Sequence, residues 1–166
     1  MNSKTKKFII IAALVYIILV ALSWFKFINN NSKDSEYRTG TYFCKISIIN
    51  EGGTKVHKWD IAIAKNNTKS GIVENESNGK SLDKFWNTVL NINTKRLNLS
   101  LAIADLLLAL IIFVYVQNGG KILKNKVNKK TIQIIIILFA ILFIYRISIS
   151  YIELRGLYKD INYYFN

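Results

Sequence analysis

Three long and nearly unbroken apolar runs constrain this chain more than any other feature. They cover residues 8–25, 97–117 and 132–150. At 1.5 Å of rise per residue, an α-helix of about 20 residues crosses the roughly 30 Å hydrocarbon core of a bilayer. Because lipid offers no partner to a backbone amide, each run is predicted to be a helix, although isoleucine-rich segments favour strands in water. The sequence therefore predicts an α-helical integral membrane protein with three transmembrane helices.

Two charged residues test this assignment, because Asp105 lies inside the second run and Arg146 lies near the end of the third. The second run carries thirteen Leu, Ile, Phe or Val side chains, and so does the third. Thirteen such residues contribute about −4 to −8 kcal/mol to insertion, against about +3 kcal/mol for one central charge. Both runs are therefore predicted to insert.

The lysines predict the orientation. Residues 1–7 hold three lysines and residues 118–131 hold five, and neither segment contains an acid, so together they supply +8 of the net charge of +13. Basic loops stay in the cytoplasm. The N-terminus and the loop 118–131 are therefore predicted to be cytoplasmic, and residues 26–96 and the tail 151–166 to lie outside the cell membrane. Because topology explains most of the charge, we expect no nucleic-acid partner.

The first run is predicted to be an uncleaved signal anchor. The tripeptide Ala-Leu-Ser at 21–23 is a passable signal-peptidase site, so cleavage is the alternative. Trp24 and Phe25 follow that site directly and are unfavourable to cleavage. Either outcome leaves the rest of the topology unchanged.

The outer segment 26–96 is predicted to be a small α+β domain made of a β-hairpin and one helix. Its first part, 26–40, is polar and is expected to be a loop. Residues 41–49 and 54–65 alternate between apolar and polar side chains and are joined by the Asn- and Gly-containing turn 50–53. Two alternating runs joined in this way indicate a hairpin.

The rest of the outer segment is expected to cover that hairpin. Residues 66–71 are expected to form a turn and 71–74 a short third strand. Residues 81–92 are predicted to be a helix that packs on the hairpin, with no strong breaker before the second span. Its apolar stripe consists of Leu82, Phe85, Trp86, Val89 and Leu90.

The C-terminal tail, 151–166, has a helical apolar stripe and four tyrosines. This pattern predicts a helix that lies in the outer membrane interface. A frayed tail anchored by its aromatic residues is the alternative.

Asp105 is the strongest functional signal, because an acid within a membrane span usually faces other helices or water. It shares one helix face with Asn98, Ala102 and Ala109. Small residues at this spacing let a second helix approach closely, and polar ones bond across. These four residues therefore predict a helix-packing stripe.

Two other residues lie at a similar depth in the neighbouring spans. At 1.5 Å per residue, Asp105 and Tyr16 are about 12 and 13 Å below the outer ends of their spans. Arg146 is about 6 Å below the outer end of its span. An arginine side chain is long enough to close this difference in depth. We predict an intramembrane cluster of Tyr16, Asp105 and Arg146. Its role stays open among holding the helices together, handling protons or ions, and binding a partner within the membrane.

Catalysis is weakly indicated. His57 is the only histidine and Cys44 the only cysteine, and the chain has no P-loop, GxGxxG, HExxH or CxxC motif. A nucleophile–base pair of Cys44 and His57 across the hairpin is the one enzymatic alternative. We expect His57 to be exposed on its strand and Cys44 to lie in the core, although Cys44 could also cross-link two copies. We predict no metal site, no cofactor and no enzymatic activity.

The sequence is expected to encode a non-enzymatic membrane protein that binds another membrane or secreted protein, or a peptide, at the outer face. Immunity, exclusion and accessory-subunit proteins are of this kind. Tyr42, Trp59 and Trp86 are the expected contact residues of the outer domain. The alternative is an oligomeric, holin-like effector that forms pores or depolarises the membrane. The Lys-, Asn- and Ile-rich, proline-free composition resembles that of proteins from AT-rich bacterial genomes.

The predicted topology can be tested in intact cells with an impermeant thiol reagent. A cysteine introduced at Lys126 is expected to stay unlabelled until the membrane is permeabilised, because the basic loop is predicted to be cytoplasmic. Labelling from outside, or a purified chain that stays dissolved without detergent, would contradict the topology.

Overall fold

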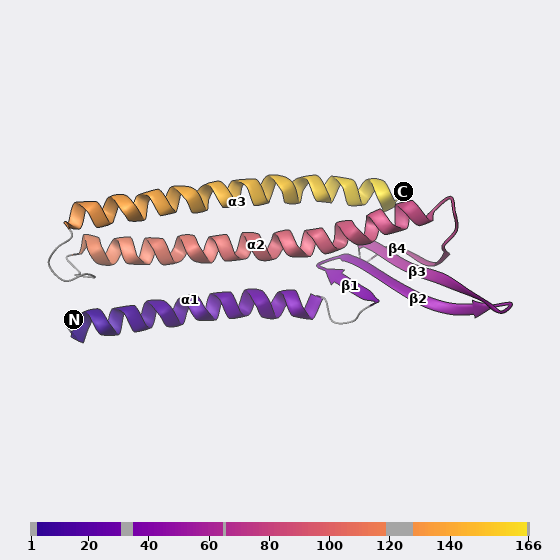
Figure 1. Ribbon diagram of the computed structural model, residues 1–166, viewed down its shortest axis with the longest axis horizontal. Helices are drawn as coiled ribbons and strands as arrows, with labels where there is room; N and C mark the ends of the chain where they lie inside the picture. Colours follow the sequence, from indigo (N-terminus) through magenta and orange to yellow (C-terminus); the bar gives the residue numbers. More distant parts are fainter. Residues whose placement is uncertain (1–2, 31–34, 65, 119–127, 166) are drawn as a thin grey trace. The chain divides into compact units, whose positions relative to one another are not determined.

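A computed structural model of the chain describes residues 3–30, 35–64, 66–118 and 128–165. The first two residues and most of the predicted basic loop 118–131 lie outside the described residues. The elements, in chain order, are α1 (Ser3–Asn30), β1 (Glu36–Thr39), β2 (Tyr42–Glu51), β3 (Thr54–Ala64), β4 (Asn67–Val73), α2 (Gly79–Gln117) and α3 (Lys129–Phe165) (Figure 1).

All three helices are long and apolar enough to cross a membrane, as their apolar runs predicted. Each one extends beyond its predicted apolar run. The chain divides into two compact units, which are described separately. A helical unit contains residues 1–24 and 97–151, and a mixed unit contains residues 25–96 and 152–166.

In the helical unit, α1 and α2 are antiparallel neighbours. Near one end, the hydroxyl groups of Ser23 and Ser100 are 2.6 Å apart. Near the other end, Tyr115 Oη donates a hydrogen bond of 2.9 Å to Thr5 Oγ1. Polar side chains therefore connect the two helices at both ends of their contact.

In the same unit, α3 lies beside α2 and is also antiparallel to it (Figure 1). Lys129 Nζ, at the start of α3, donates a hydrogen bond of 2.9 Å to the backbone oxygen of Gln117 at the end of α2. Gln133 Nε2 donates to Gln117 Oε1 over 2.5 Å. Since the last carbonyls of a helix lack intrahelical partners, Lys129 satisfies one of them.

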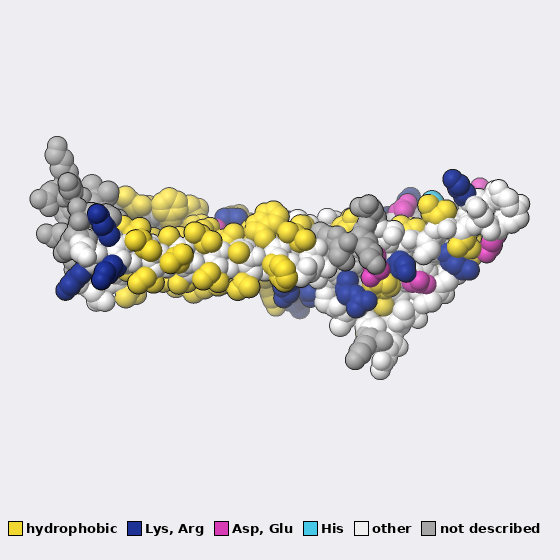
Figure 2. All heavy atoms as spheres, turned by 90° about the horizontal axis from the view of Figure 1, so that it is seen from below, with side chains coloured by type: hydrophobic (Ala, Val, Ile, Leu, Met, Phe, Trp, Pro, Cys, Tyr) yellow, Lys and Arg dark blue, Asp and Glu magenta, His cyan; other side chains and the backbone are white. Residues whose placement is uncertain are grey.

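The surface of the helical unit is dominated by exposed aliphatic and aromatic side chains, which Figure 2 shows as a yellow band along the helices. Such a continuous apolar surface is unfavourable in water. It is compatible with contact with a lipid bilayer.

In the mixed unit, four antiparallel strands form one sheet in the order β1-β2-β3-β4. The predicted hairpin is confirmed, because β2 pairs with β3 from Glu51↔Thr54 onward. The connection is the two-residue turn Gly52-Gly53, whose φ angles are 59° and 87°. A two-residue hairpin turn of the favoured type needs positive φ at both positions, and glycine adopts it without steric cost.

β1 and most of β4 lie where the sequence predicted a loop and a turn, whereas the last residues of β4 overlap the short third strand expected at 71–74. β1 lies in the expected loop 26–40, and α1 also continues into that segment as far as Asn30, where Asn30 Nδ2 donates to Asn93 Oδ1 over 3.0 Å. β1 forms because its backbone pairs with β2, with Tyr37 opposite Cys44, and because Thr39 is fully buried.

The turn expected at residues 66–71 is also wrong, because most of it belongs to β4. β4 pairs with β3 through a ladder with two register shifts. Gly71 has a φ of 69°, and its amide donates to Asp60 Oδ1 over 2.8 Å. At this irregular position the Asp60 carboxylate thus accepts a hydrogen bond that a backbone carbonyl would accept in a regular ladder.

The first half of α2 covers one face of the sheet, as the sequence predicted for residues 81–92. The helix begins at Gly79, two residues before Ser81, and the backbone oxygen of Asn78 accepts the amides of Ser81 and Leu82. Its buried apolar side chains in this half are Leu82, Phe85, Val89 and Ile92.

The end of α3 completes the core of the mixed unit. Its stripe residues Leu154, Ile161 and Phe165 are buried, and Tyr158 stacks on Tyr42 with ring centroids 5.5 Å apart. The tail 151–165 is helical as predicted, but the side expected to face the membrane interface is covered by protein. The physical reason is that a sheet and one helix make a small core, and the tail adds apolar area to it.

Arg96 of α2 connects the sheet to the end of α3, and its guanidinium group occupies the space beside Gly40. Its Nη1 donates to Thr39 Oγ1 over 3.3 Å, and its Nε donates to Tyr158 Oη over 2.9 Å. A Cβ atom at Gly40 would lie 2.8 Å from Arg96 Nη1, and Gly40 has a φ of 67°. Gly40 therefore provides both the backbone conformation and the room for the guanidinium group.

Gly40→Ala is expected to destabilise the mixed unit more than Gly52→Ala. Both replacements carry the cost of a left-handed residue, roughly 1–2 kcal/mol. Only Gly40→Ala also displaces Arg96, because nothing lies within 4 Å of a Cβ at Gly52. Thermal unfolding in detergent, followed by near-ultraviolet circular dichroism, compares the two variants. Equal losses would show that the contact with Arg96 is energetically neutral.

Candidate functional site

The structure brings together the three residues of the predicted intramembrane cluster, each from a different helix. Tyr16 Oη of α1 donates a hydrogen bond of 2.8 Å to Asp105 Oδ1 of α2. Arg146 Nη1 of α3 forms an ion pair of 3.3 Å with Asp105 Oδ2. Both carboxylate oxygens therefore have a partner, and Asp105 connects all three helices.

Burial differs between the two charged members of this cluster. The side chain of Asp105 is 21% exposed and that of Arg146 is 54% exposed. A guanidinium carries five donors, and near a membrane surface it can turn its outer donors towards water or headgroups. Arg146 thus neutralises the acid on one side and presents donors to its surroundings on the other.

The predicted helix-packing stripe is only partly buried. Ala102 and Ala109 are 1% and 8% exposed, whereas Asn98 is exposed, so the expectation is wrong at Asn98. The polar contact at this end of α2 is made by Ser100, which meets Ser23. A helix turns by about 100° per residue, so a position two residues away faces a different neighbour.

A second small pair was missed by the sequence reading. Ala12 of α1 and Ala104 of α2 are 6% and 3% exposed, and both line a hollow between these helices. Ala12 lies one helical turn before Tyr16 and Ala104 lies one position before Asp105. Both alanines therefore lie next to the polar cluster, where small side chains let the helices approach closely.

The three expected contact residues of the outer domain are used inside the mixed unit. Trp59 is 2% exposed, so the expectation is wrong for this residue. Trp86 is half-buried and makes edge-to-face contacts with Tyr37 and Trp59, at centroid distances of 4.5 and 6.0 Å. Tyr42 stacks on Tyr158, and burial raises the pKa of its phenol above the usual value. These rings build the core because a small sheet has few other large side chains to bury.

Cys44 and His57 do not come together. Cys44 lies opposite Ile61 and His57 opposite Ile48, which is four residues farther along β2 and about 13 Å away at 3.3 Å per residue. Cys44 is fully buried, and burial raises the pKa of its thiol, so little thiolate is present at neutral pH. The suggested cross-link between two copies through Cys44 is therefore incompatible with the folded unit.

The end of the β2–β3 hairpin presents apolar side chains that the core does not use. Ile48 is 65% exposed although it lies on the same face as the buried Trp59. Ile49 and Val56 form the next pair of the register and point to the other face. We call residues 48–57 the hairpin end.

A polar groove lies beside the hairpin end. Glu74 Oε2 accepts a hydrogen bond of 2.9 Å from Trp59 Nε1 and lies 3.1 Å from His57 Nδ1. The groove contains side chains of both signs, and no group of three or more metal-ligating residues occurs among the described residues. Its lining residues are Lys55, Val56, His57, Glu74, Asn75, Glu76, Gly79, Lys80 and Asp83.

No family model, no curated protein and no solved structure matches this chain. Its function is therefore inferred from its own residues and their geometry.

The hydrogen bond between Tyr16 and Asp105 is expected to be worth about 0.6 kcal/mol, the average for polar pairs between membrane helices. A double-mutant cycle of Tyr16→Phe and Asp105→Leu, read by unfolding in mixed micelles, measures this coupling. The pair Tyr145→Phe and Asp105→Leu is the control, because Tyr145 is 63% exposed. Equal coupling in both cycles would contradict a specific bond between Tyr16 and Asp105.

Proposed function

We propose that this chain is a non-enzymatic membrane protein that binds a partner protein or peptide at the extracytoplasmic side of the cell membrane. The partner is another membrane or secreted protein, as for immunity, exclusion or accessory-subunit proteins. In this proposal the N-terminus is cytoplasmic, and the hairpin end with its polar groove is the contact surface.

The observation that carries the proposal is the exposed apolar end of the hairpin next to a groove of charged side chains. Interfaces commonly combine an apolar centre with a polar rim. Ile48 supplies the apolar centre, being 65% exposed beside His57. Glu74, Glu76 and Lys80 supply acceptors and donors around it.

The charge of the segment between the first two spans supports an acidic partner. Residues 26–96 contain 12 basic and 7 acidic side chains, a net charge of +5. Opposite charge accelerates the encounter of two proteins and makes it sensitive to salt. The separation of Cys44 from His57 supports the non-enzymatic part of the proposal.

A photo-cross-linking amino acid at position 48 is expected to capture one discrete partner in intact cells. The same amino acid at Thr68, an exposed residue of β4, is the control. With the identified partner purified, Ile48→Lys is expected to weaken binding about tenfold or more, as for a central contact residue. Thr68→Lys adds the same charge and is expected to leave affinity unchanged. Equal effects of the two variants, or no partner at position 48, would overturn the proposal.

A further inference from the structure

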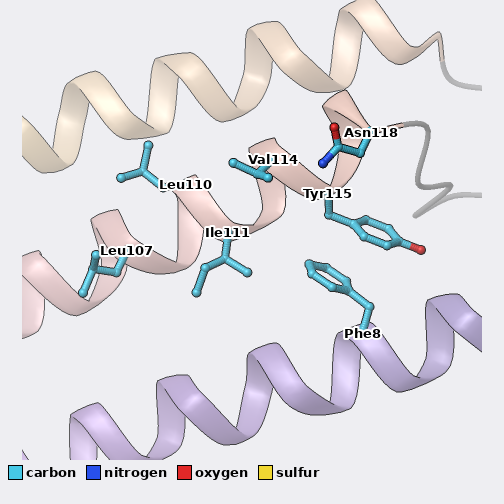
Figure 3. A pocket seen from close by; sticks show the side chains of 7 residues that line it. All are labelled: Phe8, Leu107, Leu110, Ile111, Val114, Tyr115 and Asn118. Atoms are coloured by element: carbon cyan, nitrogen blue, oxygen red, sulfur yellow. The ribbon is translucent and has the colours of Figure 1, made fainter.

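The helical unit contains an apolar groove between α1 and α2, at the end where α1 begins and α2 ends. Figure 3 shows the ring of Phe8 extending from α1 towards Tyr115 on α2, with Ile111 beside them. The lining residues are Phe8, Leu107, Leu110, Ile111, Val114, Tyr115 and Asn118. The walls are thus hydrocarbon, and the one amide side chain lies at the end of α2.

The aromatic contact at this end fixes the spacing of the two helices. The rings of Phe8 and Tyr115 stack with centroids 3.7 Å apart and an angle of 8° between their planes. Tyr115 is held in place by its hydrogen bond to Thr5. The side chains that line the groove beside this stack, Leu107, Leu110 and Val114, are 42–56% exposed.

The groove continues along the helices. A second hollow, which contains Ala12 and Ala104, shares Leu107 and Ile111 with the first. From residue 104 to residue 118 the path measures about 21 Å at 1.5 Å per residue. This exceeds the hydrocarbon thickness of one leaflet, which is half of about 30 Å. The path is therefore long enough for an acyl chain of one leaflet, with the wider part between Leu107 and Asn118.

Basic side chains surround the end of the groove. Lys4 lies one helical turn before Phe8 on the same side of α1. Lys129 donates to the carbonyl of Gln117, the residue before Asn118. Figure 2 shows dark blue Lys and Arg side chains at one end of the hydrophobic band.

Negative charge is scarce in this unit. Asp105 is the one acid among its described residues, and it lies thirteen residues before Asn118, about 20 Å along the helix. The basic end of the groove therefore has no described acid to neutralise it. An apolar path that opens among lysines is complementary to a molecule with a hydrocarbon chain and an anionic head.

We propose that this groove binds an anionic diacyl phospholipid. One acyl chain lies along Leu107, Ile111 and Val114, and the phosphate lies between Lys4 and Lys129. The Asn118 amide donates a hydrogen bond to a phosphate or ester oxygen. A soluble phosphate lacks the chain that the groove accommodates, and a zwitterionic lipid carries a cation that the lysines repel. This inference is independent of the partner proposed above, because it uses other residues and another unit.

Native mass spectrometry of the full chain in detergent tests the headgroup. Phosphatidylglycerol and phosphatidylcholine with identical acyl chains are offered together, and phosphatidylglycerol is expected to be retained preferentially. Lys4→Gln is expected to lower this preference about fivefold, the loss that corresponds to one lysine near a lipid surface. Lys6→Gln is the matched control, because it removes the same charge from a position about 200° around the helix.

The acyl groove is tested with a replacement that fills it. Val114→Trp is expected to lower retention of both lipids at least fivefold, whereas Ile137→Trp, at an exposed position of α3, leaves retention unchanged. Far-ultraviolet circular dichroism checks that each variant keeps its helices. Equal effects of Lys4→Gln and Lys6→Gln, or unchanged retention in folded Val114→Trp, would overturn the proposal.

Discussion

Backbone hydrogen bonding in hydrocarbon is the constraint on which this structure depends. A membrane interior supplies no partner for an amide, so each apolar run must satisfy its backbone within its own helix. Association of the helices then depends on packing and on polar side chains, because lipid is as apolar as leucine. In the helical unit these polar contacts lie at several levels, from Ser23 with Ser100 through Asp105 to Tyr115 with Thr5. A few such contacts define which faces meet, while most other side chains stay exposed.

The mixed unit depends instead on the hydrophobic effect. Its core must be assembled from apolar side chains that are buried away from water. No single segment is large enough for this. The sheet contributes Trp59, the first half of α2 contributes Phe85, and the end of α3 contributes Ile161, all of them almost fully buried. Segments that are distant in the sequence therefore share one small core. This sharing explains why the aromatic rings are inside the unit and are absent from the hairpin end.

The sequence was most informative where one physical pattern dominates. Hydropathy located the three helices, and alternation with a Gly-Gly turn located the hairpin. Depth along the spans was enough to single out Tyr16, Asp105 and Arg146, which the structure places in contact. Their role stays a prediction.

β1, and β4 before residue 71, were not predicted because they depend on tertiary pairing. β1 has only four residues and the first part of β4 is polar, and both exist because β2 and β3 offer backbone partners. The apolar stripe of the tail was predicted. Periodicity shows which side chains share a helix face, but it does not show what that face packs against. The same limit affected Asn98, whose polarity suggested a contact that Ser100 makes instead.

The irregular edge strand β4 affects how neighbouring copies of the protein can associate. A regular edge strand is a template to which another chain can add, and proteins held in a membrane meet repeatedly in two dimensions. β4 carries Lys69 within its ladder and pairs with β3 through two register shifts. A bulged and charged edge of this kind pairs poorly with a second strand. The sheet is thereby protected against strand-by-strand aggregation on that side.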